Sequence, residues 1–298
     1  MDFLRIGVVR IGNIGTAHAN HIYQGKVNGA ILTAVCDVTE NRLNYCKSNF
    51  AGVHVFCNYK DLMASGFIDA VIVSVPHPLH AEIAGYALDM GIHVLVEKPV
   101  DISVSRAKLL NEKAKNSGKV FSIMFNQRTT PIFKKTKEIV KSGQIGTINS
   151  SNWIITNWYR TQNYYNSCDW RATWKGEGGG VLLNQAPHNL DLWQWICGMP
   201  NEITAFCTIG KYHHIEVEDT ASIFAKYENS AYGSFITSTG EYPGTNRFEI
   251  SGDSGKIVLE DGILKLWQLK QCVSENIFKN EKSEKSFDEI EYDYQEFF

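Results

Sequence analysis

The chain has 298 residues, a formal net charge of −3 and a hydrophobic content of 44%, values typical of a globular protein with enough apolar mass for two domains. This charge, without any basic run, excludes a general affinity for nucleic acid or an anionic membrane. The seven cysteines are scattered without a C-x-x-C pair, which indicates reduced thiols and predicts neither a disulfide framework nor a metal site. Met1–Arg5 runs directly into an apolar segment without signal-peptide features, and no apolar run reaches membrane-spanning length, so we expect a cytoplasmic location.

Residues 1–125 alternate short apolar runs with amphipathic stretches. The apolar runs are rich in β-branched residues, as in parallel strands buried on both faces. They are Leu4–Val9, Ile31–Cys36, Ala70–Val75, His93–Val96 and Val120–Phe125. The stretches between them, such as Ala81–Met90 and Ser103–Asn116, have helical periodicity. The alternation predicts a Rossmann-type α/β domain, a doubly wound parallel sheet that binds ligands beyond the carboxyl ends of its strands.

The pattern changes after Gly143, where strand-like segments follow one another closely. These segments are Thr147–Thr156, Ile203–Ile209, Ala221–Tyr227, Ala231–Ser238, Phe248–Gly252, Lys256–Glu260 and Ile263–Leu269. One helical insert, Asn184–Ile196, interrupts them, and the acidic stretch Glu281–Phe298 is predicted to be a solvated edge or tail. We therefore expect a second, α+β domain over residues 126–298 with a mostly antiparallel sheet.

A glycine-containing turn, Arg10-Ile11-Gly12-Asn13-Ile14-Gly15, directly follows the first predicted strand. It matches the second and third glycines of the dinucleotide fingerprint G-x-G-x-x-G, with Arg10 in place of the first glycine. The second glycine lets the backbone approach a pyrophosphate, and the third lets the helix pack closely on the strand. Gly12, Asn13, Ile14 and Gly15 are therefore predicted to bind a dinucleotide at the N-terminus of a helix.

An acidic residue, Asp37, ends the second predicted strand, where such a residue binds the adenosine ribose hydroxyls. Its charge would repel a 2′-phosphate, so NAD is the predicted cofactor and NADP the less favoured one. Arg42, in the segment that follows, is assigned to the same site. The alternative is that Asp37 is a plain turn residue after a strand.

Three polar segments follow later strands of the same predicted sheet. They supply the remaining predicted cofactor-binding residues, which are Ser74, Pro76, His77, His80, Glu97, Lys98 and Asn126. Because the carboxyl ends of parallel strands share one edge, we expect these side chains to face the same crevice. Each segment alone could equally be an exposed polar loop.

A glycine run, Gly178–Gly180, precedes the helical insert of the second domain. With Asn184 as the N-cap, Pro187 falls in the first turn, where its missing N–H costs little. Asn184, His188 and Asp191 would then share one helical face. A histidine there is suited to proton transfer near neutral pH, whereas a lone histidine is otherwise a structural hydrogen-bonding residue.

Aromatic residues and arginines are interleaved between the glycine run and the first strand of the second domain. From this region Trp158 and Arg171, together with Arg128, are predicted to bind substrate along with Asn184 and His188. Aromatic faces and guanidinium donors suit a carbohydrate, but equally suit a core or a subunit interface.

Taken together and in this order, these segments resemble the glucose–fructose oxidoreductase/inositol dehydrogenase/MocA family. The matching segments are Gly7–Gly15, Val35-Cys36-Asp37, Val73–His80, Glu97-Lys98-Pro99, Phe125–Arg128 and Gly178–Asp191. The resemblance implies an NAD(P)-dependent oxidoreductase that transfers a hydride between the nicotinamide and a sugar, sugar derivative or cyclic polyol. It also implies that Lys98 and His188 meet at the nicotinamide and substrate, that Asn184 orients the substrate, and that a large open sheet makes a homo-oligomer.

Two departures from the family pattern leave alternatives open. Arg10 replaces a glycine that the family usually keeps, and the chain ends soon after its last predicted strands, where members usually continue. The alternatives are a catalytically silent ligand-binding or sensor protein of the same fold, or an NAD-using glycosidase. The sequence does not predict which sugar reacts, at which carbon, or in which direction.

Overall fold

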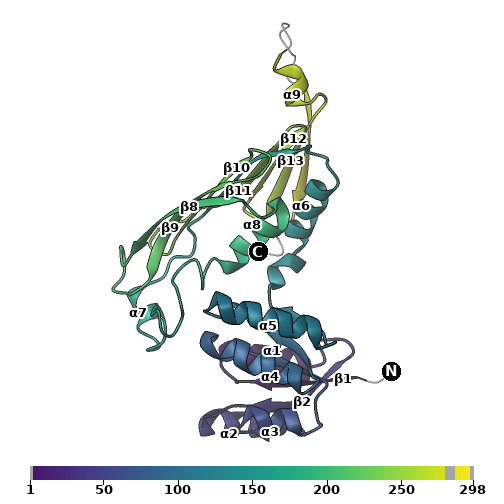
Figure 1. The fold of residues 1–298 in the computed structure, drawn as a ribbon, viewed down its shortest axis with the longest axis vertical. Helices are drawn as coiled ribbons and strands as arrows, with labels where there is room; N and C mark the ends of the chain where they lie inside the picture. Colours follow the sequence, from purple (N-terminus) through teal and green to yellow (C-terminus); the bar gives the residue numbers. More distant parts are fainter. Residues whose placement is uncertain (1–2, 279–285, 296–298) are drawn as a thin grey trace. The chain divides into compact units, whose positions relative to one another are not determined.

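The computed structural model describes residues 3–278 and 286–295 of the chain. The chain forms two units (Figure 1). The first consists of the chain up to Met124 together with Gly176–Gly178, and the second of Phe125–Lys175 together with the chain from Gly179 onward. A short glycine-rich segment from the middle of the sequence is therefore part of the N-terminal unit.

The first unit is built on a six-stranded sheet of order β3-β2-β1-β4-β5-β6, in which all neighbouring strands are parallel. Its strands are β1 (Leu4–Val9), β2 (Ala30–Cys36), β3 (His54–Phe56), β4 (Ala70–Val73), β5 (His93–Val96) and β6 (Phe121–Ile123). The strand order reverses between β1 and β4, so the predicted doubly wound fold is confirmed. β3 was not predicted, because it has three residues and none of them is fully buried.

Helices cover both faces of this sheet, and alternate strand residues point to opposite faces. The helices are α1 (Asn13–Tyr23), α2 (Glu40–Asn49), α3 (Tyr59–Ala64), the 3₁₀ turn η1 (His77–Leu79), α4 (His80–Asp89) and α5 (Val104–Asn116). Val8 and Ile72 pack with residues of α1 and α2, whereas Val9 and Val73 pack with residues of α3, α4 and α5. Each of these buried aliphatic side chains contributes about 1.5–3 kcal/mol of transfer free energy.

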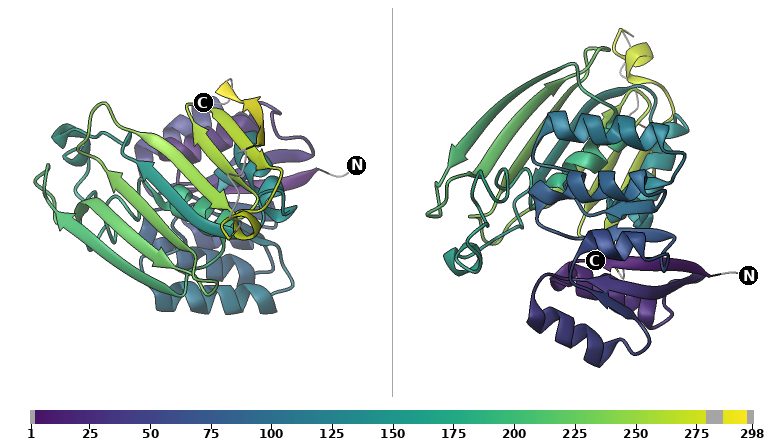
Figure 2. Two further views of the ribbon diagram at one scale, coloured as in Figure 1. Left: turned by 90° about the horizontal axis from the view of Figure 1, so that it is seen from above. Right: turned by 60° about the horizontal axis from the view of Figure 1, so that its bottom comes forward.

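The second unit is built on an eight-stranded sheet of order β14-β13-β12-β11-β7-β10-β9-β8. Its strands are β7 (Ile148–Ile155), β8 (Glu202–Ile209), β9 (Glu218–Lys226), β10 (Tyr232–Ser238), β11 (Asn246–Gly252), β12 (Gly255–Glu260), β13 (Ile263–Leu269) and β14 (Phe287–Asp293). β7 and β10 pair in parallel, and the other neighbouring strands of the described sheet pair antiparallel. The predicted mostly antiparallel sheet is confirmed, and its strands lie side by side in both further views (Figure 2).

The acidic C-terminal stretch is predicted to be a solvated edge or tail, and its described part is an edge strand. Phe287–Asp293 forms the edge strand β14, which pairs with β13 along its whole length. Its side chains are mostly exposed, so the strand is a solvated edge, as its acidic composition predicts. The parts of the predicted tail at 281–285 and 296–298 lie outside the described residues.

One face of the large sheet is covered and the other is open. The helical elements of this unit are η2 (Asn126–Thr129), α6 (Pro131–Lys141), α7 (Gln162–Tyr165), α8 (Pro187–Cys197) and α9 (Val273–Asn276). Residues of α6 and α8 pack on a core in which Trp153 stacks on Phe248 with ring centroids 4.3 Å apart. On β9, Ile223 and Ala225 are buried, whereas Phe224 between them is 55% exposed. Across the described helices, none combines the length and the apolar composition that crossing a membrane requires.

Candidate active site

The turn between β1 and α1 has the geometry that the glycine fingerprint requires. Gly12 is the N-cap of α1, no side chain caps the helix there, and Asn13 and Ile14 are its first helical residues. The amides of a first helical turn have no acceptor within the helix, so they point outward toward an anion. Arg10 has a φ of 73°, the left-handed region that glycine adopts at the first fingerprint position.

Gly15 is required by the close approach of the turn to the end of β4. A Cβ atom at Gly15 would lie 2.0 Å from the carbonyl oxygen of Arg10 and 2.6 Å from Ser74 Oγ. The Ser74 hydroxyl lies 3.0 Å from the Val9 carbonyl and 2.8 Å from the Arg10 carbonyl, and donates its one proton between them. Ser74, predicted to bind cofactor, thus fixes the phosphate turn.

Asp37 is held in place by three protein donors. Its carboxylate accepts from the Ile11 amide at 2.8 Å, from the Thr39 amide at 2.9 Å and from the Thr39 hydroxyl at 2.8 Å. The residue is only 5% exposed. Because a carboxylate offers about four acceptor positions, Asp37 retains one for a ribose hydroxyl.

The phosphate turn and Asp37 open onto one cavity of about 690 Å³. Its wall is made by the turn, the end of β2, the start of α2 and the loop after β4, and includes Arg10, Gly12, Asp37, Arg42, Val75 and Pro76. A backbone cradle that admits no Cβ, a helix N-terminus and a buried carboxylate fit a dinucleotide. These residues of the first unit would hold its phosphates and its adenosine ribose.

The segment after β5 carries a half-buried lysine, Lys98, whose pKa two carboxylates influence. Burial lowers the pKa of Lys98, while the charges of Glu97 and Glu177 oppose that shift. Glu97 is itself anchored, since its carboxylate accepts from His18 Nε2 on α1 at 2.7 Å. Glu177 belongs to the glycine-rich segment that joins the first unit, and its carbonyl accepts from His77 Nδ1 at 3.0 Å.

His80 holds together the loops that follow β4 and β5. Its Nδ1 lies 2.6 Å from the Pro99 carbonyl and its Nε2 lies 2.7 Å from the Val75 carbonyl. The residue is 1% exposed, and burial lowers its pKa against the opposing effect of these two carbonyls. With both ring nitrogens engaged, the structure gives His80 a role in positioning the loop that carries Lys98.

The start of α8 differs from the prediction. The helix begins at Pro187, with Ala186 as N-cap, and Asn184 lies in the preceding turn, where its amide donates to the Gly180 carbonyl at 3.0 Å. The prediction that Asn184 caps the helix and shares a face with His188 and Asp191 is therefore wrong. Proline at the first helical position has no N–H to leave unsatisfied, so it sets the boundary.

Glu218 on β9 fixes the turn that leads into α8. The Gly180 amide lies 3.0 Å from each of its carboxylate oxygens, and the Leu182 amide donates to it at 3.1 Å. A Cβ at Gly180 would lie 1.9 Å from the Glu218 carbonyl oxygen, so the position admits only glycine. Sequence reasoning missed Glu218, because its partners are far away in the chain and no local motif marks it.

Arg128 forms an ion pair with Asp191 of α8. Its guanidinium donates to both oxygens of Asp191, at 2.7 and 2.6 Å, and this carboxylate raises the pKa of Arg128. The guanidinium also lies 5.9 Å from the centroid of the Phe125 ring, whose centroid is 5.9 Å from that of His188 in an edge-to-face arrangement. The structure thus brings the predicted residues Arg128 and His188 into one cluster, which joins η2, the element that contains Asn126, to α8.

The aromatic stretch forms a stack of rings and guanidinium groups. Arg160 lies over Trp158 and Tyr164, at 5.9 and 5.0 Å, and Arg171 lies over Tyr164 at 4.2 Å and donates to its hydroxyl at 2.5 Å. Trp158 Nε1, Arg160 Nε and Arg171 Nε are buried without an acceptor among the described residues. Buried donors without a protein acceptor indicate that bound water or an oxygen-rich ligand accepts from them. Arg160 was not among the predicted site residues.

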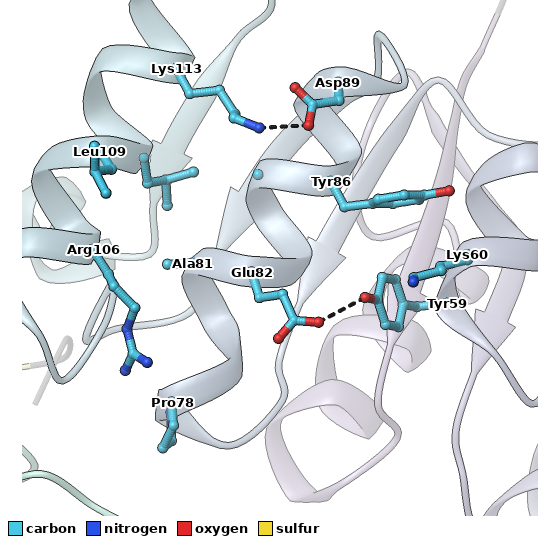
Figure 3. A pocket seen from close by; sticks show the side chains of 12 residues that line it. Tyr59, Lys60, Pro78, Ala81, Glu82, Tyr86, Asp89, Arg106, Leu109 and Lys113 are labelled. Carbon is cyan, nitrogen blue, oxygen red and sulfur yellow. Dashed lines mark hydrogen bonds and ion pairs between the residues drawn. The ribbon is translucent and has the colours of Figure 1, made fainter.

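A second cavity, of about 540 Å³, lies among α3, α4 and α5 of the first unit (Figure 3). Its polar side chains bond to one another: Glu82 accepts from the Tyr59 hydroxyl at 3.0 Å, and Lys113 pairs with Asp89 at 2.5 Å. Of these two interactions only Lys113–Asp89 is an ion pair, whereas the first cavity contains the phosphate turn and Asp37, so we assign the dinucleotide to the first cavity. Among the residues that the structure describes, no group of three or more His, Cys, Asp or Glu is arranged to hold a metal ion.

Two family models match the chain. The oxidoreductase family with an NAD-binding Rossmann fold matches residues 4–125, and the GFO/IDH/MocA C-terminal domain matches residues 133–258. Among curated proteins, a myo-inositol 2-dehydrogenase of Thermotoga maritima is 27% identical over 266 residues, which cover 87% of this chain and 75% of the relative.

Solved structures of the same kind superpose on the chain. The WlbA dehydrogenase from Bordetella pertussis, in complex with NADH and UDP-GlcNAcA, has a TM-score of 0.79 and 27% identity over 86% of this chain and 79% of its own. A levoglucosan dehydrogenase in complex with NADH has a TM-score of 0.81 over 97% of this chain and 80% of its own, and at 21% identity it supports the fold alone.

Proposed function

Because the chain belongs to the Gfo/Idh/MocA oxidoreductase family, with its NAD-binding Rossmann domain, we propose that it is a dehydrogenase of a sugar, sugar derivative or cyclic polyol. The observation that carries the proposal is the cavity in which a glycine-only phosphate turn, the N-terminus of α1 and the buried carboxylate of Asp37 come together. The sugar and polyol dehydrogenases among the relatives support a substrate with several hydroxyl groups on a ring.

The nicotinamide of the bound cofactor supplies the hydride acceptor or donor. Oxidation of a secondary alcohol to a ketone removes one hydride from carbon and one proton from oxygen. The protein must therefore accept that proton and stabilise the oxygen as its negative charge develops.

We assign the proton to His188 and the stabilisation of the oxygen to Lys98. An imidazole exchanges a proton near neutral pH. The Phe125 and His188 rings pack edge to face, and this contact orients the imidazole. Burial lowers the pKa of Lys98, which makes its ammonium a stronger donor to a developing alkoxide. Asn184, in the turn before α8, orients the substrate, and the ring and guanidinium stack around Arg171 offers donors to its hydroxyls.

The test is a panel of cyclic polyols and sugars, oxidised with NAD by the full chain and followed by NADH absorbance. For the best substrate, His188→Asn and Lys98→Met should each lower kcat by roughly 10²–10⁴-fold, as expected for loss of a positioned acid–base or charge-stabilising group. Thr33→Val, in the first unit but outside the wall of the cofactor cavity, is the control. Undiminished turnover in either of the first two variants would contradict these roles.

The same panel separates the other two hypotheses. Saturable NADH binding without turnover of any substrate would favour a ligand-binding or sensor protein. Release of a glycone from a glycoside by protein that retains its NAD would favour an NAD-using glycosidase.

A further inference from the structure

His18 of α1 links the helix that begins at the phosphate turn to the segment that carries Lys98. Its Nε2 lies 2.7 Å from Glu97 Oε1, and the two side chains are only 17% and 11% exposed. His18 lies in the second turn of α1, and Glu97 directly precedes Lys98 in the sequence. One hydrogen bond therefore joins the helix that the cofactor phosphates would use to the lysine that the substrate oxygen would use.

The Glu97 carboxylate depends on this hydrogen bond. The residue is 8% exposed, and its other oxygen, Oε2, accepts a longer hydrogen bond of 3.3 Å from the adjacent Lys98 amide. A buried carboxylate stays charged only where donors are directed at it, and hydrogen bonds to charged groups are among the strongest in proteins. The short bond from His18 is therefore the contact that keeps Glu97 charged and in place.

Glu97 in turn acts on the charge of Lys98. Burial lowers the pKa of Lys98, and Glu97 is the larger of the two charges that oppose this shift, with Glu177 the other. Burial also lowers the pKa of His80 of α4, and Glu97 opposes that shift too. Among the described residues, the titratable groups that act on Glu97 and Lys98 are thus His18, His80 and Glu177. If Glu97 moved away or became protonated, the Lys98 ammonium would lose part of its electrostatic support.

We propose that His18 is a positioning residue for the reaction, which holds the Glu97 carboxylate beside Lys98 and thereby keeps the lysine charged and in place. The inference deepens the proposed function and rests on it, because the role of Lys98 at the substrate oxygen comes from there. A group that stabilises a developing alkoxide must be fixed before the reaction begins, and a displacement of about 1 Å can lower the rate by roughly 100-fold. His18 supplies this fixation without touching the substrate.

The test compares two amides at position 18. In His18→Gln the amide nitrogen stands near the place of imidazole Nε2 and can donate to Glu97, whereas in His18→Asn the side chain is one methylene shorter and cannot. His18→Asn should lower kcat at least about tenfold, and His18→Gln should restore it to within about threefold of the wild type. His21→Asn, at an exposed histidine of the same helix, is the matched control and should leave kcat unchanged.

The affinity for NADH should change by less than about threefold in all of these variants. The phosphate turn is held separately, by the Ser74 hydroxyl and by the bond from the Ile11 amide to Asp37. A loss confined to kcat distinguishes positioning of Lys98 from general damage to α1, which would weaken NADH binding as well.

A titration of Lys98 itself gives a readout that does not depend on turnover. Lysine labelled with ¹³C at the ε carbon is incorporated into the full chain, and the Lys98 signal is assigned by its absence in Lys98→Met. The pKa of Lys98 should fall in His18→Asn and in Glu97→Gln, because both remove the effect of the Glu97 charge. It should stay at the wild-type value in His18→Gln and His21→Asn.

The outcomes separate this inference from the proposed function. An unchanged pKa of Lys98 in His18→Asn would overturn the inference, whatever happens to turnover, because His18 would then not act through Glu97. Full turnover by a folded His18→Asn protein would also overturn it, while leaving the proposed dehydrogenase intact. A wild-type chain that oxidises no substrate would count against the proposed function, and the titration would still decide whether His18 supports the charge of Lys98. If His18→Asn does not fold, Glu97→Gln must show both the lower pKa and the lower kcat.

Discussion

Replacing Gly15 with alanine tests the phosphate turn directly. A Cβ at this position would lie 2.0 Å from the Arg10 carbonyl oxygen, whereas real Cβ atoms keep at least 3.0 Å from such a neighbour. The backbone must therefore open by about 1 Å, and Ser74 Oγ, 2.6 Å away, must leave the two carbonyls between which it donates.

The expected loss of stability follows from three contributions. Overpacking against backbone costs about 2 kcal/mol. Loss of the Ser74 hydrogen bond costs about 1 kcal/mol. Alanine has a higher helix propensity than glycine, which offsets about 1 kcal/mol of this destabilisation. The net destabilisation is about 2 kcal/mol, which for a unit of this size lowers the thermal midpoint by roughly 8 °C.

The matched control is Gly85→Ala in α4. A Cβ at Gly85 would meet its nearest neighbour, Lys113 Cδ, at 3.6 Å, an ordinary van der Waals contact. This variant should therefore gain about 1 kcal/mol from helix propensity. Thermal unfolding followed by circular dichroism, with calorimetry of NADH binding, compares the two. A Gly15→Ala protein that melts and binds NADH like the wild type would refute the close approach on which the site depends.

Three further variants test the charge of Lys98, the support of the Gly180 turn by Glu218 and the open face of the large sheet. Lys98→Met should raise the thermal midpoint although it lowers kcat, since burial lowers the pKa of Lys98 and its charged form destabilises the folded state. Because the pKa of Lys98 is lower in the folded state than in the unfolded state, its charge destabilises the fold fully below the folded pKa, and this destabilisation disappears as pH rises toward 10.5. The difference in thermal midpoint between variant and wild type should therefore shrink as pH rises toward 10.5. Equal midpoints at all pH values would contradict this. Glu218→Gln places an amide group against the Gly180 and Leu182 amides and should cost about 1–3 kcal/mol, measured by urea unfolding. Phe224→Glu, on the open face of the large sheet, should dissociate the expected homo-oligomer in mass photometry, and an unchanged assembly would show that this face is not the interface.

The elements with continuous apolar runs could be predicted from the sequence. The observed bounds of β1 and β5 are those predicted, because these strands are buried in the middle of a parallel sheet. β3 and β14 could not be predicted in this way. β3 is short and only partly buried, and β14 is an acidic edge strand that β13 holds through backbone pairing rather than through an apolar face.

In the candidate site, too, only the parts built from residues close in sequence could be predicted. The phosphate turn and the loop around Lys98 could be found because their residues are adjacent in sequence. The pairing of Arg128 with Asp191 joins residues 63 positions apart, and the support of Gly180 by Glu218 spans 38 positions. The packing of α8 and β9 in the second unit brings these partners together. This packing cannot be predicted from the spacing of residues along the chain.

Calorimetric titration of the full chain with NADH measures whether the cavity at the phosphate turn binds a dinucleotide. We expect saturable binding of one dinucleotide per chain, with a dissociation constant between about 1 µM and 1 mM, the range usual for enzyme ligands. We also expect that this binding is lost in Gly15→Ala and kept in Gly85→Ala. Absence of binding by both NADH and NADPH to the folded wild-type chain would contradict a dinucleotide site at this turn.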